Sequence, residues 1–427
     1  MNAKRKNPWI WVPSLYYAQG LPYVIVMTVS VIMYKRLDIS NAQIALYTSW
    51  LYLPWVIKPL WSPVVDLFKT KRWWVVIMQL IIGAGLAGVA LTLPTENFFR
   101  YSLAFLWLLA FSSATHDIAS DGFYMLGLEE KDQSYFVGIR TTFYRLAMLS
   151  GQGLLIILAG FFEVYTGRIA LAWSITFVFI AVFFSGISLY HKFMLPRPVG
   201  DISVPREAGN GLFHEFFRTF GSFFRKKNIL PAVAFLLLYR LGEAQLIKLA
   251  SPFLLDPASE GGLGLATGEV GWIYGTIGLL ALSLGGIIGG VAASQKGLRF
   301  WIFPMALAMN LPNLVFVYLS AALPQSIWLI SGAVAVEQFG YGFGFTAYVL
   351  FMIYFSAGEH KTAHYAICTA FMALGMMLPG MVSGWIQEAI GYHAFFIWVV
   401  FCTIPGFILI RFLKIDASFG RKIKSQA

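Results

Sequence analysis

Continuous apolar runs of about twenty residues or more, separated by short polar segments, repeat along the whole chain. A helix needs about 20 apolar residues to cross a bilayer, whereas barrel strands alternate apolar and polar positions over about ten. The pattern therefore predicts an all-α integral membrane protein. We expect twelve spans, near residues 9–33, 42–64, 73–93, 99–126, 135–160, 169–193, 229–255, 267–293, 300–322, 326–355, 362–386 and 392–413.

The composition agrees with this prediction and excludes other classes. Of the 427 residues, 58% are hydrophobic and 12% are charged, against about 25% charged in soluble proteins. The net charge is +11, but the basic residues flank apolar segments and form no separate basic domain, so we expect no nucleic-acid partner. Cys368 and Cys402 lie in apolar runs, so no disulfide framework, metal site or cofactor is expected.

The distribution of basic residues predicts the orientation of the chain. With a cytoplasmic N-terminus, 22 Lys and Arg residues flank the inner ends of the spans and four flank the outer ends. Because Lys and Arg gather in cytoplasmic loops, we expect both termini in the cytoplasm. Lys4, Arg5 and Lys6 precede a full-length span without a small-residue cleavage site, so no cleavable signal is predicted.

A long polar connection divides the chain into two halves. Residues 194–228 contain several prolines and glycines and separate an N-terminal six-helix half, 1–193, from a C-terminal half with a basic cytoplasmic tail, 229–427. Phenylalanines at three- and four-residue spacing over 212–224 predict a short interfacial helix within this cytoplasmic linker. A basic turn follows the second span, 62–72, and its counterpart in the other half, 289–299, lacks the acid. This organisation resembles the major facilitator superfamily.

Charged and polar residues within the spans carry the functional information. Counting from the span ends places Gln19, Arg145, Arg240 and Glu337 near the midplane, with Glu243 one turn away. An unpaired charge there costs about 2.5 to 3.5 kcal/mol on insertion scales. These groups must therefore pair or line water, so they form either a structural ion-pair network or a substrate and proton site between the halves.

Several polar residues within the spans allow two interpretations of their role. Asp117 and Asp121 are four residues apart, so they share one helix face; neighbouring carboxylates raise one pKa, which suits a proton carrier. Asp121, near a helix end, fits a gate equally well. Arg240 and Glu243 can pair along their own helix, and Lys58 can snorkel to the interface. Aromatic residues at depth, including Tyr16, Trp50, Tyr144 and Tyr239, suit sugar rings.

Seven short segments in order resemble the AmpG-type muropeptide permeases over about residues 15–410. They read GLP at 20–22, KPLWSPVVD at 58–66, THDIASD at 115–121, YRL at 144–146, YRLGE at 239–243, GEVG at 268–271 and PGMVSGW at 379–385. The resemblance implies a proton-driven, multi-pass importer in the inner membrane of a Gram-negative bacterium, which carries N-acetylglucosaminyl-anhydromuramyl peptides and serves peptidoglycan recycling. The chain departs from the family pattern at His116, Gln19 and 239–243, which bears on the substrate.

From these observations we predict a proton-coupled secondary transporter, not an enzyme, whose partners are a glycopeptide, protons and the bilayer, and which acts as a monomer. The proton-coupling candidates are Asp117, Asp121, Glu243 and Glu337. The substrate-binding candidates are Gln19, Tyr16, Trp50, Lys58, His116, Tyr144, Arg145, Tyr239, Arg240 and Gln338. The gating candidates are Asp66, Lys69 and Arg72.

Two other readings remain open at this stage. The first is a major-facilitator transporter of another anionic solute, such as an acyl-coenzyme A or a small peptide. The second belongs to a different class, a non-transporting membrane sensor or a membrane-embedded enzyme. An enzyme would need a cluster of catalytic residues at the interface, and the histidines at 116, 191, 214, 360, 364 and 393 are dispersed in sequence. A sensor would be expected to lose the central charges.

Overall fold

The computed structural model describes residues 6–198, 200–201, 218–358 and 360–420. Ten helices in these ranges are long and apolar enough to cross a membrane. The chain separates into two compact units, residues 1–37 with 57–216 and residues 38–56 with 217–427. The segment 38–56, expected with the N-terminal half, thus makes its contacts with the second unit.

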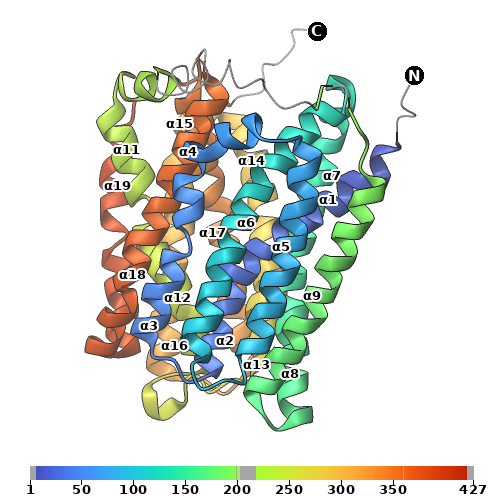
Figure 1. The fold of residues 1–427 in the computed structure, drawn as a ribbon. Helices are drawn as coiled ribbons and strands as arrows, with labels where there is room; N and C mark the ends of the chain where they lie inside the picture. The colour runs from blue at the N-terminus through green and yellow to red at the C-terminus, as the bar shows by residue number, and fades with distance from the viewer. Residues whose placement is uncertain (1–5, 199, 202–217, 359, 421–427) are drawn as a thin grey trace. The chain divides into compact units, whose positions relative to one another are not determined.

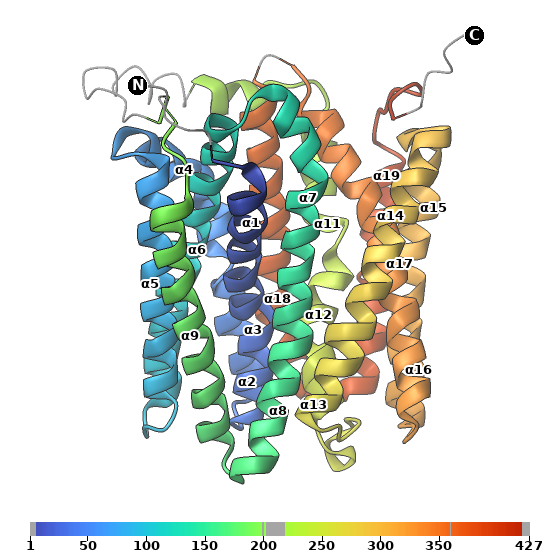
Figure 2. The same cartoon turned by 90° about the vertical axis from the view of Figure 1, so that its right-hand side faces the viewer.

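The first unit is a group of long helices around α1. Helices α5 and α9 pack side by side (Figure 2), and α1 packs against α7. The helices of this unit are α1 Pro8–Val24, α2 Ser30–Arg36, α4 Leu53–Leu67, which begins four residues before the unit boundary, α5 Lys71–Thr92, α6 Phe98–Gly127, α7 Glu130–Leu149, α8 Leu155–Thr166 and α9 Ile169–Met194. Single π-helical turns at Ile25–Val29 and Ser150–Leu154 join α1 to α2 and α7 to α8.

The second unit contains α3 Asn41–Trp50 in addition to the later helices. Helix α3 packs against α18, and α14 packs against α17. The later helices are α11 Ile229–Leu238, α12 Leu241–Leu255, α13 Thr267–Val270, α14 Leu279–Lys296, α15 Leu298–Asn310, α16 Leu314–Ala322, α17 Ile327–Ser356, α18 Lys361–Phe401 and α19 Ile404–Ile410. A π-helical turn, Gly271–Gly278, joins α13 to α14.

The difference between twelve predicted spans and ten membrane-length helices in the described residues arises at two places. The predicted span 42–64 is divided into α3 and α4 at Leu51 and Tyr52, because Pro54 has no N–H to bond the carbonyl of Trp50 and its ring clashes there. The last two predicted spans run together as Ala363–Ile410, although Gly391 has a non-helical backbone with φ 76°. The number twelve therefore stays a prediction.

Part of the predicted interfacial helix, 212–224, lies outside the described residues. Residues 218–224 are helical. Phe223 is fully buried there, against the aromatic core of the second unit, while Phe224 is 44% exposed. This segment therefore packs one aromatic face on the unit and leaves another outward, as an interfacial helix does.

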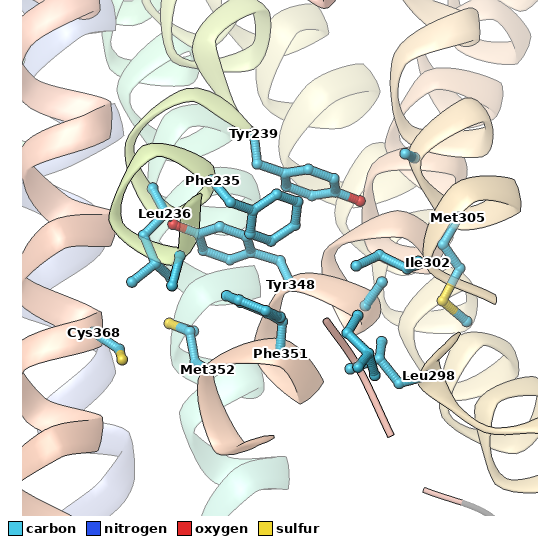
Figure 3. Packing of buried hydrophobic residues seen from close by; sticks show 14 of the residues in the cluster. Phe235, Leu236, Tyr239, Leu298, Ile302, Met305, Tyr348, Phe351, Met352 and Cys368 are labelled. Atoms are coloured by element: carbon cyan, nitrogen blue, oxygen red, sulfur yellow. Dashed lines mark hydrogen bonds between the residues drawn. The ribbon is translucent and has the colours of Figure 1, made fainter. Parts of the chain in front are cut away.

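The core of the second unit is aromatic and supports a break between α11 and α12. Tyr239 stacks on Tyr348 with ring centroids 5.3 Å apart, next to Phe235 (Figure 3). Helix α11 ends at Leu238 and α12 begins at Leu241. The carbonyls in the last turn of α11 therefore need hydrogen-bond donors from outside the helix. The hydroxyl of Tyr348 donates to the carbonyl of Leu236. The break, which carries Arg240, is thus held by the packed core.

Candidate functional site

An ion pair joins the second and fourth predicted spans inside the first unit. Lys58 on α4 lies 3.5 Å from the carboxylate of Asp117 on α6, and the two side chains are 29% and 14% exposed. Such a pair in a poorly solvated place is stabilising only while both partners carry charge. The structure therefore brings together a predicted substrate-binding lysine and the predicted proton carrier.

Asp121 takes part in a second charged group, one turn further along α6. Tyr16 donates its hydroxyl hydrogen to Asp121 at 3.1 Å and accepts a hydrogen bond from Arg140 at 2.9 Å. The Arg140 guanidinium lies 3.6 Å from Asp121 and 5.0 Å from the ring centres of Tyr16 and Tyr124. Each of the two carboxylates thus has its own cation.

Sequence reasoning missed Arg140, although a signal was present. Arg140 lies one helical turn before Tyr144, so both can face the same side of α7, and Tyr144 interacts electrostatically with Asp117 and Asp121. A basic residue on the same helix face as the predicted site residue Tyr144 is itself a candidate for the site. The arginine that does face the aspartates is Arg140, and Arg145 forms no ion pair within the part of the chain that the structure describes.

Close packing of α1 against α7 positions this group. A Cβ added at Gly20 would lie 2.9 Å from the carbonyl oxygen of Tyr144, so only glycine allows this approach. The neighbouring Gln19 is buried, and among the described residues its Oε1 has no hydrogen-bond partner. Gln19 therefore offers an unused acceptor on α1, next to the point where α1 packs closely on α7.

His116 points into a polar network between helices instead of toward the carboxylates. Its ring lies 2.9 Å from the Gln79 amide, and Gln79 lies 2.9 Å from His191, whose other nitrogen lies 2.9 Å from Ser14. This chain of contacts joins α1, α5, α6 and α9 and satisfies buried polar groups that would otherwise be costly. The surroundings of His116 add nothing to its prediction as a substrate ligand.

The second unit holds a separate charged cluster around Arg240. Its guanidinium donates to the Tyr341 hydroxyl and lies 5.2 and 5.0 Å from the ring centres of Tyr341 and Phe345. Glu243 interacts electrostatically with Arg240 and with Glu337, and the amide of Gln338 donates to Glu337 at 2.9 Å. Arg240, Glu243, Glu337 and Gln338, which we call the α12–α17 cluster, therefore lie together.

Arg240 and Glu243 do not form the helical ion pair that their spacing allows. Arg240 has a non-helical backbone, φ −106° and ψ 21°, which removes the regular three-residue relation on which such pairs depend. Its side chain is directed to α17 instead. The helix break thus decides the partner of the arginine.

Three buried polar atoms of the α12–α17 cluster have no hydrogen-bond partner among the described residues: Nε of Arg240, Oε2 of Glu243 and Oε1 of Glu337. The two glutamates are each 1% exposed. An unsatisfied buried polar atom costs about 1 to 3 kcal/mol, and more when charged. Such a cost is characteristic of a site that binds protons or a polar ligand.

Lys248 is a buried cation that the sequence analysis did not single out. It is 2% exposed, donates to the Thr48 hydroxyl at 2.9 Å and lies 5.2 Å from the ring centre of Tyr52. Both partners come from residues 38–56, so this contact helps to hold that segment in the second unit. A lysine within an apolar span is a signal that sequence reasoning could have used.

Two predicted aromatic ligands differ in accessibility. Tyr239 is 1% exposed, is stacked in the core and donates its hydroxyl hydrogen to the carbonyl of Gly344 at 3.2 Å. Trp50, at the end of α3, is 36% exposed. Of the two, only Trp50 presents a ring surface that a ligand can reach without displacing the core.

The predicted gate lies where the linker meets α5. The side chain of Asp66 lies outside the described residues, and Lys69 is exposed with a left-handed backbone, φ 64°. Arg72 donates to the carbonyl of Lys192. Asp201, from the linker, accepts the backbone N–H groups of Lys71 at 2.6 Å and Arg72 at 3.0 Å, so it caps the N-terminus of α5.

The comparisons with known proteins agree with the resemblance. The sequence model of the BT1 family matches residues 19–201. The anhydromuropeptide permease of Escherichia coli K12 is 26% identical, covering 86% of this chain and 72% of its own. The putative transporter AmpG 4 of Rickettsia conorii is 24% identical, covering 92% of this chain and 94% of its own.

The fold is shared with solved transporters of the major facilitator type. A bacterial homologue of the human lysosomal transporter Spinster, in an inward-facing and unoccupied conformation, superposes with a TM-score of 0.69 over 94% of this chain and 96% of its own, at 14% identity. The predicted relationship to the AmpG-type permeases and the predicted all-helical fold class are thus confirmed. The ten membrane-length helices in the described residues agree with the predicted multi-pass membrane protein.

Proposed function

Starting from this relationship to the AmpG-type permeases, we propose that the protein imports cell-wall muropeptides in symport with protons, by alternating access. The observation that carries the proposal is the α12–α17 cluster, where two buried glutamates and an arginine have unpartnered polar atoms. A related protein is named an anhydromuropeptide permease. Anhydromuropeptides carry carboxylates, sugar rings and amides, which arginines, aromatic rings and glutamine amides bind well.

The proton site is proposed at Asp117, with Asp121, Glu243 and Glu337 as further acids. When Asp117 takes up a proton, it loses its charge and its ion pair with Lys58, which lies 3.5 Å away. The freed ammonium group can then bind a carboxylate of the substrate. Proton binding and substrate binding are coupled in this way, because Lys58 cannot serve both carboxylates equally.

Substrate contacts are proposed for Arg240, Gln338 and Arg145 at carboxylates and amides, and for Trp50 at a sugar ring. Within the first unit, Tyr16, Tyr144 and Gln19 are proposed as hydrogen-bonding ligands. His116 and Tyr239 were also predicted as ligands, and their engagement in interhelical contacts makes an indirect role more suitable for them.

The decisive experiment measures uptake of a labelled N-acetylglucosaminyl-anhydromuramyl tripeptide into proteoliposomes under an imposed proton gradient. We expect accumulation that needs an acidic exterior and disappears with a protonophore. Accumulation that is equal without a gradient would refute proton coupling. A lack of uptake under every gradient, with binding retained, would favour a sensor.

The runner-up is a transporter of another anionic solute, because Lys58, Arg240 and Arg145 can bind any carboxylate or phosphate. Competition distinguishes the two readings. Unlabelled acyl-coenzyme A or a small acidic peptide should compete weakly against the labelled muropeptide if the main proposal is correct. Inhibition by these compounds at lower concentration than by the unlabelled muropeptide would favour the runner-up.

We further propose that both termini are cytoplasmic and that Asp66, Lys69 and Arg72 form an inward gate. An acid at the cytoplasmic end of α4 can pair with basic residues only when that side is closed. Asp66→Ala should therefore speed the labelling of single cysteines placed on the cytoplasmic side. The same labelling rate in the variant and the parent would remove the gate from the proposal.

A further inference from the structure

A cavity in the second unit lies where three helix ends meet, away from the α12–α17 cluster. It measures about 410 Å³ and is lined by residues before and within the first turn of α11, at the end of α17 and after α19. Helices α11 and α19 lie side by side (Figure 1) and are in contact. Because spans of this length begin and end at the membrane surface, the cavity lies at headgroup depth.

The lining of the cavity has a basic part and an apolar part. Lys226, Lys227 and Lys414 contribute the charges, and Pro231, Phe355 and Phe412 contribute apolar surface. None of the described lining residues is an acid. The acid two residues beyond Lys414 is Asp416, which accepts hydrogen bonds from Ser418 and does not line the cavity.

Lys226 has a structural task in this arrangement. Its Nζ donates to the carbonyls of Phe355 at 2.6 Å and Ala357 at 2.8 Å, so it binds carbonyls at the C-terminal end of α17, where a positive charge is favourable. The side chains of Lys227 and Lys414 have no hydrogen bond or ion pair with any residue that the structure describes. Two ammonium groups at the rim thus remain available to an anion.

The apolar side continues onto the outer surface of the helices. Leu230 is 80% exposed and Phe412 is 60% exposed, so in a membrane-embedded chain both face acyl chains. A cavity of this size holds a headgroup and the start of an acyl chain. Basic residues beside apolar surface at headgroup depth match the anionic head and hydrocarbon tail of one molecule.

We propose that this cavity is a binding site for an anionic phospholipid, with its phosphate between Lys227 and Lys414 and its acyl chains along Leu230 and Phe412. The lipid joins the start of α11 to the ends of α17 and α19. Its site is distinct from the proposed transport pathway and does not depend on the transported substrate.

Native mass spectrometry of the full-length protein, titrated with phosphatidylglycerol or phosphatidylethanolamine, tests the proposal. We expect tighter binding of phosphatidylglycerol. The double variant Lys227→Gln, Lys414→Gln should bind it about thirtyfold more weakly, which corresponds to about 2 kcal/mol for two basic side chains. Its binding of phosphatidylethanolamine should change by less than about threefold.

The matched control removes the same charge elsewhere. Lys192 and Lys361 are exposed and lie outside the cavity, so Lys192→Gln, Lys361→Gln should leave phosphatidylglycerol binding unchanged. Equal losses in both double variants would show a nonspecific charge effect and overturn the proposal. Equal binding of both lipids to the parent protein would also overturn it. Competition by inorganic phosphate at millimolar concentration would overturn it as well, because it would indicate a small-anion site.

Discussion

The two units hold their membrane-embedded charges in different ways. In the first unit, Asp117 and Asp121 each face a cation, Lys58 and Arg140, and their carboxylates are 14% and 45% exposed. In the second unit, Glu243 and Glu337 are each 1% exposed, and one oxygen of each has no hydrogen-bond partner among the described residues. In the first unit each carboxylate is balanced by a cation. In the second unit buried polar atoms without hydrogen bonds lower the stability of the fold.

This difference suggests a division of tasks. An ion pair is a two-state element, because neutralising either partner releases the other. Glu243 and Glu337 form no ion pair within 4 Å among the described residues, so a proton or a ligand that reaches the unpartnered oxygen of each lowers its free energy. We therefore expect the first unit to respond to protons by breaking a pair, and the second to respond by filling its unmet hydrogen bonds.

The largest expected effect comes from removing the charge of the ion pair. Asp117→Asn should abolish accumulation driven by a proton gradient and leave counterflow exchange measurable, because exchange needs binding and movement but no net proton transfer. Proteoliposome uptake measures the accumulation, and a counterflow assay measures the exchange. The control is Glu163→Gln, since Glu163 pairs with Arg36 at 2.9 Å outside the proposed site, and it should accumulate substrate normally. Normal accumulation by the Asp117 variant would remove Asp117 as the carrier.

The next effect separates stability from transport. Glu337→Gln keeps the shape of the side chain and removes the buried charge, so the free energy of unfolding should stay equal or rise, while uptake falls about tenfold or more. Lys58→Gln leaves Asp117 without its cation and should lower the free energy of unfolding by about 1 to 3 kcal/mol. Thermal unfolding in detergent at neutral pH compares the stability of the Glu337→Gln and Lys58→Gln variants. A larger loss in the Glu337 variant would reverse the assignment of the two units.

A third, smaller effect concerns the ligand-binding role of the second unit. Arg240→Lys keeps the charge but loses the planar fork that binds a carboxylate in two places. The apparent KM for an acidic muropeptide should rise about tenfold, because a hydrogen bond to a charged group contributes about 1.5 to 3 kcal/mol. A disaccharide without the peptide should be affected much less. If both substrates weaken equally, Arg240 serves the packing against Tyr341 and Phe345.

The smallest effect tests a satisfied charge. Asp201→Ala removes the carboxylate that accepts the first N–H groups of α5 and should lower the free energy of unfolding by about 0.5 to 2 kcal/mol, as loss of a helix cap does. Uptake at low temperature should stay near normal. A complete loss of uptake in a stably folded variant would move Asp201 from capping to gating.

Much of the architecture followed from one-dimensional patterns. Apolar runs of membrane length, few charges and motifs such as THDIASD at 115–121 predicted the helical class and the AmpG relationship. The helix spacing also placed Asp117 and Asp121 on one face. The number of spans was harder to predict, because proline at 54 divides one apolar run and hydropathy does not register a missing N–H.

The sequence by itself determined which groups must be compensated inside the membrane, since a charge in an apolar run is costly wherever its partner lies. Only the tertiary structure decided the partners. Spacing along a helix defines a face but not the neighbouring helix, so Arg140 was found at Asp121 and His116 at Gln79 only through packing. At Arg240, a break in the helix turns the side chain toward Tyr341 on α17, so the pair with Glu243 that the sequence spacing allows does not form.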